Sequence, residues 1–166
     1  MGSDEVINVM DEVARRLSVL AGLDVTGVSH AADMLTLHFG PLREVTTRRG
    51  TSKLVGAWAL HVQCNWRVEY DGETLITQDD FRRSDEDVKR VVEKLDQLLV
   101  TPDRAIVSGV YVSPPANLRL SLSRNTTIAI TPNGVAGDED WRFFAPGSDK
   151  PHFVIEGGMI DPDSLT

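Results

Sequence analysis

Four cations lie within one short stretch between Gly40 and Gly56, namely Arg43, Arg48, Arg49 and Lys53. Guanidinium and ammonium groups bind carboxylates and phosphates, so this stretch is a candidate site for an anion or an acidic partner. It lacks the Gly-x-x-x-x-Gly-Lys-[Ser/Thr] pattern, which excludes a P-loop. We predict an exposed, mobile loop, in which Arg48, Arg49 and Lys53 are the candidate ligand-binding residues.

The dipeptide Trp-Arg occurs twice, as Trp66-Arg67 and Trp141-Arg142. Neighbours on a strand point to opposite faces, so each tryptophan is predicted in the core and each arginine on the other face. One interpretation is structural, with Arg67 paired to a carboxylate such as Glu69. The other is functional: Arg67 and Arg142 flank a shared groove and hold a carboxylate or phosphate bidentately.

Three consecutive acidic residues, Asp138, Glu139 and Asp140, follow a glycine-rich stretch. They lack the spaced twelve-residue loop of an EF-hand, so we predict a solvated acidic loop rather than a calcium site. Such a loop is a candidate docking surface for a basic protein partner.

The remaining reactive side chains give no catalytic pattern. The four histidines contain no His-x-x-x-His spacing and Cys64 is the only cysteine, so we expect no metal and no cofactor. Cys64 shares the parity of buried neighbours and is predicted to be inert, whereas His38 and His61 fall on solvated faces. No Gly-x-Ser-x-Gly elbow is present. We therefore expect a protein that is not an enzyme.

Two helices and a set of strands must position these residues. Apolar residues from Val6 to Leu20, and again from Val88 to Leu99 after a Ser84 cap, recur at helical spacing. From Trp58 to Tyr70 apolar and polar residues alternate, which predicts one long, bent strand, and Asp71-Gly72 predicts a tight hairpin turn after it. Shorter strands are predicted at 34–39, 118–123 and 152–156, with a loose tail at 157–166.

The order of these elements is repeated. The helix at Val6 matches the helix at Val88, and Val25-Thr26-Gly27-Val28 matches Val107-Ser108-Gly109-Val110 at the same spacing. The two Trp-Arg strands follow in the same order. We predict one α+β domain over residues 1–166, with antiparallel sheet and two helices. It is built from two similar helix-plus-meander units, at about 3–82 and 84–160, that are related by a pseudo-twofold axis.

Composition narrows the class of protein. The 166 residues carry a formal net charge of −8, which argues against a nucleic-acid partner. No window approaches about 18 apolar residues and the chain opens without a basic or apolar leader, so we expect no membrane partner. With a single cysteine, these features favour a cytoplasmic protein. We also expect a homodimer, because exposed edge strands can pair with those of a second copy.

The run Ala59-Leu60-His61-Val62-Gln63-Cys64-Asn65-Trp66-Arg67 resembles a segment of an uncharacterised family of small bacterial proteins. The resemblance implies a bacterial cytoplasmic source and carries no known activity. A looser likeness, in acidity and in the strand that contains Trp141, is to α+β immunity proteins of bacterial toxin systems.

Two functional hypotheses follow. The first is a non-enzymatic interaction protein of the immunity type, which binds a macromolecule through acidic side chains such as those of 138–140. The second is a small-molecule binding protein that holds an anionic ligand in the groove between the two units, with Arg67, Arg142 and the basic loop. An unrecognised enzyme would need convergent titratable groups in a pocket.

Overall fold

The computed structural model describes residues 2–165, and both predicted helices are present. Helix α1 (Gly2–Leu17) continues into the 3-10 turn η1 (Ser18–Leu20), and Val13, Leu17 and Leu20 are fully buried. The side chains of residues 2–8, and with them the predicted place of Val6, lie outside the described part. Helix α2 (Asp85–Leu99) begins after Ser84, whose hydroxyl accepts a hydrogen bond from the Asp87 amide at 3.3 Å. No helix within residues 2–165 has the length and apolar character needed to cross a membrane.

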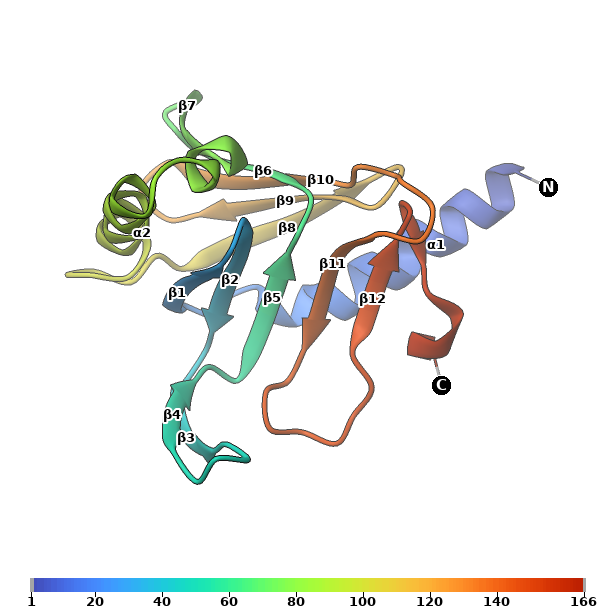
Figure 1. Ribbon diagram of the computed structural model, residues 1–166. Helices are drawn as coiled ribbons and strands as arrows, with labels where there is room; N and C mark the ends of the chain where they lie inside the picture. The colour runs from blue at the N-terminus through green and yellow to red at the C-terminus, as the bar shows by residue number, and fades with distance from the viewer. Residues whose placement is uncertain (1, 166) are drawn as a thin grey trace.

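The strands form two antiparallel sheets and a separate hairpin (Figure 1). The first sheet has the order β1 (Val25–Ala31), β2 (Met34–Phe39), β5 (Trp58–Val62), β11 (Glu139–Phe144), β12 (Phe153–Glu156) and β13 (Met159–Ile160). The second has the order β7 (Glu73–Thr77), β6 (Asn65–Tyr70), β10 (Thr126–Thr131), β9 (Asn117–Leu122) and β8 (Val107–Ser113). The hairpin joins β3 (Arg43–Thr46) to β4 (Ser52–Val55). The α+β class is therefore confirmed.

The alternating segment from Trp58 to Tyr70 crosses from one sheet to the other. It breaks at Gln63-Cys64, so that β5 lies in the first sheet and β6 in the second (Figure 1). The alternation survives the break, because Val62, Cys64 and Trp66 are all buried. The predicted turn is also present: Asp71 and Gly72 have positive φ, and β7 pairs antiparallel with β6.

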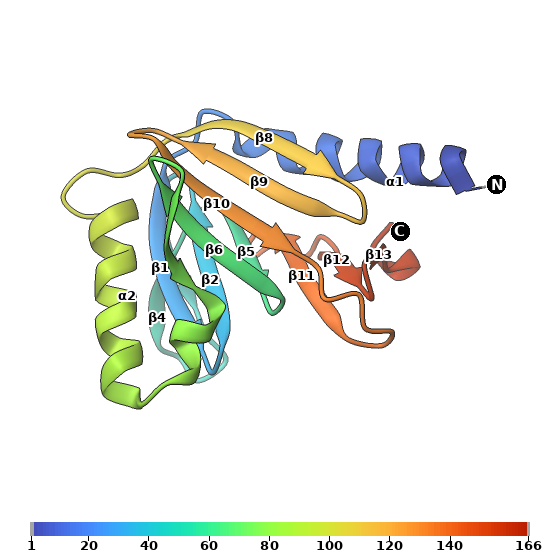
Figure 2. The same cartoon turned by 90° about the horizontal axis from the view of Figure 1, so that it is seen from above.

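Each helix packs beside the edge strand of one sheet. Figure 2 shows α1 next to β8 and α2 next to β1, and both helices contribute to one buried apolar cluster with the two sheets. The amphipathic spacing of each helix explains this placement, because one face carries the apolar residues. The 3-10 turn η2 (Gln78–Arg82) links β7 to α2 and buries Phe81 against Trp66.

The two sheets have corresponding strand orders, and each half of the chain contributes strands to both sheets. The sheet order β1-β2-β5-β11-β12 has its counterpart in β8-β9-β10-β6-β7. The register of β1 shifts between Val25 and Gly27, and that of β8 shifts between Val107 and Gly109, at the two matched Val-[Thr/Ser]-Gly sequences. Duplication of one ancestral unit stays a prediction, because this correspondence concerns order and register alone.

Two segments differ from their predicted conformation. Residues 43–55 form a hairpin rather than a loop, and the Thr47 amide donates to the Thr51 carbonyl at 2.8 Å to close its turn. The described part of the 157–166 tail is also structured, as β13 and η3 (Pro162–Leu165). Gly157 and Gly158 both have positive φ, which allows the tight turn that returns β13 onto β12.

Candidate ligand-binding pocket

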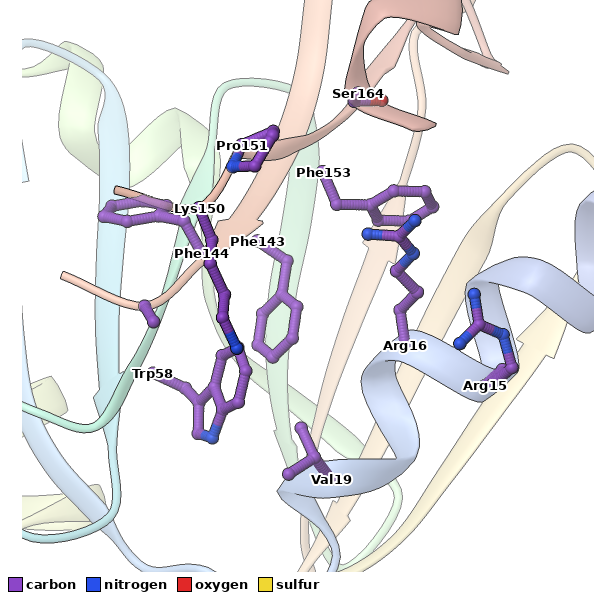
Figure 3. Close-up of a pocket in the computed structure, with 11 residues that line it drawn as sticks. Arg15, Arg16, Val19, Trp58, Phe143, Phe144, Lys150, Pro151, Phe153 and Ser164 are labelled. Carbon is purple, nitrogen blue, oxygen red and sulfur yellow. The ribbon is translucent and has the colours of Figure 1, made fainter. Parts of the chain in front are cut away.

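A cavity of about 400 Å³ opens where the end of α1 faces β5, β11 and β12 (Figure 3). This volume lies in the range of small-molecule sites. Its lining comes from α1 and η1, from the start of β5, and from the end of β11, the start of β12 and the segment between them, with one residue of η3. The lining residues are Arg15, Arg16, Val19, Trp58, Phe143, Phe144, Ala145, Lys150, Pro151, Phe153 and Ser164.

Aromatic rings form one wall of the pocket. The indole of Trp58 stacks on the ring of Phe143, with centroids 4.9 Å apart and planes inclined by 11°. Phe143 lies opposite Phe153 on the neighbouring strand, so the sheet register places the aromatic side chains together. Phe143 and Phe153 are buried, whereas Trp58 is half-buried. A flat apolar ligand can therefore stack against this wall.

Two arginines of α1 lie on the opposite side of the pocket and share one carboxylate. Arg15 Nη2 lies 2.6 Å and Arg16 Nε 2.8 Å from Glu12 Oε1. Hydrogen bonds from Arg15 and then Arg16 lower the pKa of Glu12, which therefore stays ionised. The Arg16 guanidinium also lies 4.9 Å from the centre of the Phe153 ring. Both arginines are thus held in place before any ligand arrives.

Lys150 is the uncommitted cation of the pocket. Among residues 2–165, its ammonium group has no ion pair and no side-chain hydrogen bond. Figure 3 shows its side chain extending along the pocket in the direction of Trp58. With two arginines sharing one glutamate, positive charge is in excess here, although the whole chain carries −8. The pocket can therefore attract an anion.

The outer face of the first sheet carries a second group of polar side chains. Arg142 Nη1 lies 2.9 Å from His152 Nδ1, and Arg142 Nε donates to both Glu139 oxygens at 3.0 Å. Phe144 stacks on His152 and meets the edge of His61.

The histidines of this face have lowered pKa values. Burial and the Arg142 charge lower the pKa of His61 and of His152, while Glu139 acts in the opposite direction. Burial and then Lys53 lower the pKa of His38.

The shared groove predicted for Arg67 and Arg142 is corrected by the topology. Arg67 lies on β6 of the second sheet and Arg142 on β11 of the first, each on the face opposite its buried tryptophan. Arg67 instead pairs with Glu69 at 3.2 Å, as the structural interpretation predicts. Arg119 approaches the same carboxylate at 3.6 Å.

The acidic trio is also corrected. Asp140 is 1% exposed, and its carboxylate accepts the amides of Asn133 at 2.8 Å and Gly158 at 2.7 Å. Glu139 is bonded to Arg142 and Gln63, which leaves Asp138 as the exposed member. The trio therefore holds the turn before β11 against the Gly157-Gly158 turn and is not the fully solvated loop that was predicted. Docking of a basic partner on it stays a prediction.

The basic residues of the β3–β4 hairpin remain exposed but lie outside the pocket. Arg48 and Arg49 occupy its turn and Lys53 lies on β4. Arg43 donates to the Pro146 carbonyl, which ties the hairpin to the segment after β11. Anion binding by Arg48, Arg49 and Lys53 stays a prediction.

Sequence reasoning did not select the pocket residues. Arg15, Trp58 and Lys150 come from three distant parts of the chain, and no local motif links them. The one available signal was Trp58 at the start of an alternating strand.

Cys64 is buried as predicted, and burial, followed by Asp140, raises its pKa to about 12. Within the described residues, no group of three or more His, Cys, Asp or Glu side chains is arranged for a metal ion.

Comparison with protein-family models, curated proteins and solved structures found no match. The fold and the pocket define an α+β protein of two antiparallel sheets with a cationic, aromatic cavity beside its first helix. The resemblance of the Ala59–Arg67 run to a bacterial family stays a prediction.

Proposed function

We propose that this chain is a binding protein whose pocket takes a small ligand with a flat apolar body and one anionic group. The observation that carries the proposal is the pairing of an aromatic wall, Trp58 stacked on Phe143, with the uncommitted cation Lys150. Cavities of this kind combine mostly apolar walls with a few polar groups that fix orientation.

The three cations of the pocket have different roles, which follow from their existing contacts. Arg15 and Arg16 are already neutralised in part by Glu12, so they supply a positive field but keep their positions. Lys150 has no such partner among the described residues and is free to move onto the ligand's anion. The apolar part of the ligand then stacks beside Trp58, where it removes half-buried aromatic surface from water.

Isothermal titration with two matched probes tests this function. The probes are 2-naphthalenesulfonate and its neutral analogue 2-naphthalenesulfonamide, which differ mainly in charge. The sulfonate is expected to bind more tightly, and Lys150→Met should reduce its affinity by about tenfold, equivalent to ~1.4 kcal/mol. Lys94→Met removes the same charge from an exposed position of α2 and should leave binding unchanged. Equal affinity for both probes would contradict the proposal.

A second candidate function is the docking of an acidic macromolecule on the β3–β4 hairpin. It is favoured by the exposed Arg48, Arg49 and Lys53 in a chain of net charge −8. Polyglutamate should then bind at low salt and dissociate at high salt, and Arg48→Ala combined with Arg49→Ala should weaken it. Binding that survives this double substitution would remove the hairpin as the docking site.

A further inference from the structure

One segment of the chain builds both the pocket and the polar cluster on the outer face. Between β11 and β12, Ala145, Lys150 and Pro151 line the pocket, while His152 joins the cluster. Phe144 belongs to both, because it lines the pocket and stacks on His152 with centroids 4.1 Å apart and planes inclined by 15°. A change at His152 therefore reaches the pocket wall directly.

The contact between Arg142 and His152 requires a neutral imidazole. Their nitrogens Nη1 and Nδ1 lie 2.9 Å apart. A guanidinium carries donors only, so Nδ1 must accept through its lone pair and the ring proton must lie on Nε2. A second proton on the ring would occupy Nδ1 and set two N–H donors and two positive charges against each other. The hydrogen bond cannot survive that protonation.

The charged groups around His152 do little to stabilise an added proton on its ring. The charged groups that act on His152 are Arg142 and Glu139 of β11. The same two groups act on His61, together with His38 and His152, and Lys53 of β4 acts on His38. Glu139 is the one anion in this set, and the Arg142 guanidinium already engages both of its oxygens. Further positive charge is therefore repelled by Arg142 with little compensation.

We infer that acidification releases the ligand: protonation of His152 breaks its hydrogen bond to Arg142, unpacks Phe144 and displaces the pocket wall at residues 144–151. This inference rests on the proposed binding function and concerns the regulation of the same pocket. The protein would hold its anionic ligand at neutral pH and lose it in mildly acidic solution. Histidine is the side chain whose charge changes in this range.

The test measures the affinity for 2-naphthalenesulfonate at about pH 8 and about pH 5.5, because a sulfonate stays ionised at both and the ordinary pKa of histidine, about 6.5, lies between them. Three proteins are compared: the wild type, His152→Asn and His30→Asn. Asparagine keeps an acceptor near the position of Nδ1 but does not titrate. His30 lies in a different pocket, beside Phe81, and serves as the matched control. Near-ultraviolet circular dichroism at both pH values reports whether the fold persists.

We expect the affinity of the wild type and of His30→Asn to fall by roughly tenfold at the lower pH, which corresponds to about one pKa unit of linkage. His152→Asn should bind almost equally at both pH values. A wild-type affinity that does not change with pH, an unchanged loss in His152→Asn, or a loss that coincides with unfolding would each overturn the inference. Failure of the proposed function gives a different result, because the sulfonate would then not bind at about pH 8.

Discussion

Trp66 and Trp141 occupy corresponding places in the two sheets: Trp66 lies opposite Ile130 of β10, and Trp141 lies opposite Val62 of β5. Both indoles are buried, at 3% and 0% exposure. They differ in one respect. Trp141 Nε1 donates to the Ala116 carbonyl at 3.2 Å, whereas Trp66 Nε1 is buried without a hydrogen-bond partner among the described residues.

This difference predicts unequal costs for the same substitution. Trp→Phe removes similar volume at both sites, but only Trp141→Phe also removes a hydrogen bond. Trp141→Phe should therefore lower the free energy of unfolding by about 1 kcal/mol more than Trp66→Phe. Urea denaturation of both variants measures the difference. Equal losses would show that the Ala116 contact contributes nothing.

A conservative substitution at Asp140 should lower the stability of the protein strongly. Asp140→Asn replaces one acceptor oxygen by an NH₂ donor, opposite an amide of Asn133 or Gly158 that already donates. We expect a loss of roughly 2 kcal/mol in the free energy of unfolding. Asp138→Asn, on the exposed neighbour, should stay within about 0.5 kcal/mol of the wild type. Similar results for the two variants would contradict the structural role of Asp140.

The imidazole cluster predicts that stability falls in acid. The pKa values of His38, His61 and His152 are lowered from 6.5 in the folded protein, so the unfolded chain binds more protons in this range. Their contribution is complete above about pH 6.5 and is lost as the pH falls through the folded pKa values. Denaturation midpoints across this range test the sign. His61→Asn should flatten the profile, and an unchanged slope would exclude His61 as a source.

The thiol of Cys64 should react only when the chain unfolds. It is buried, and its raised pKa of about 12 leaves almost no thiolate near neutral pH. A chromogenic disulfide reagent should be slow with the native protein and fast in denaturant. Rapid native labelling would contradict the burial.

The local patterns predicted the elements well, and the physical reason is that these patterns record burial. The alternation along β5 and β6 gave the buried parity from Leu60 to Val68, although Ala59 is also buried and Tyr70 is 45% exposed. Ser84 marked the start of α2. Which sheet each strand joins was beyond such patterns, because β11 pairs with β5 across a long separation in sequence. That pairing, together with the pairing of β6 with β10, places Arg67 and Arg142 on different sheets.

The pocket was unpredictable for the same reason. Phe143 reads as a strand residue and Lys150 as part of a loop, and only the sheet register brings them near Arg16. The acidic trio shows the converse, since Asp140 has the composition of a solvated charge run but satisfies two backbone amides. Exposure of a charge follows from its partners, which the local sequence does not contain.

The three indole N–H signals of the protein test the binding proposal most directly, in a nuclear magnetic resonance titration with 2-naphthalenesulfonate. Trp58 lines the pocket and is half-buried, whereas Trp66 and Trp141 lie in the core. Trp58→Phe identifies the first signal. We predict that the Trp58 signal shifts in a saturable way while the other two stay in place. If the Trp58 signal does not move, or if all three move together, the pocket is not the ligand site.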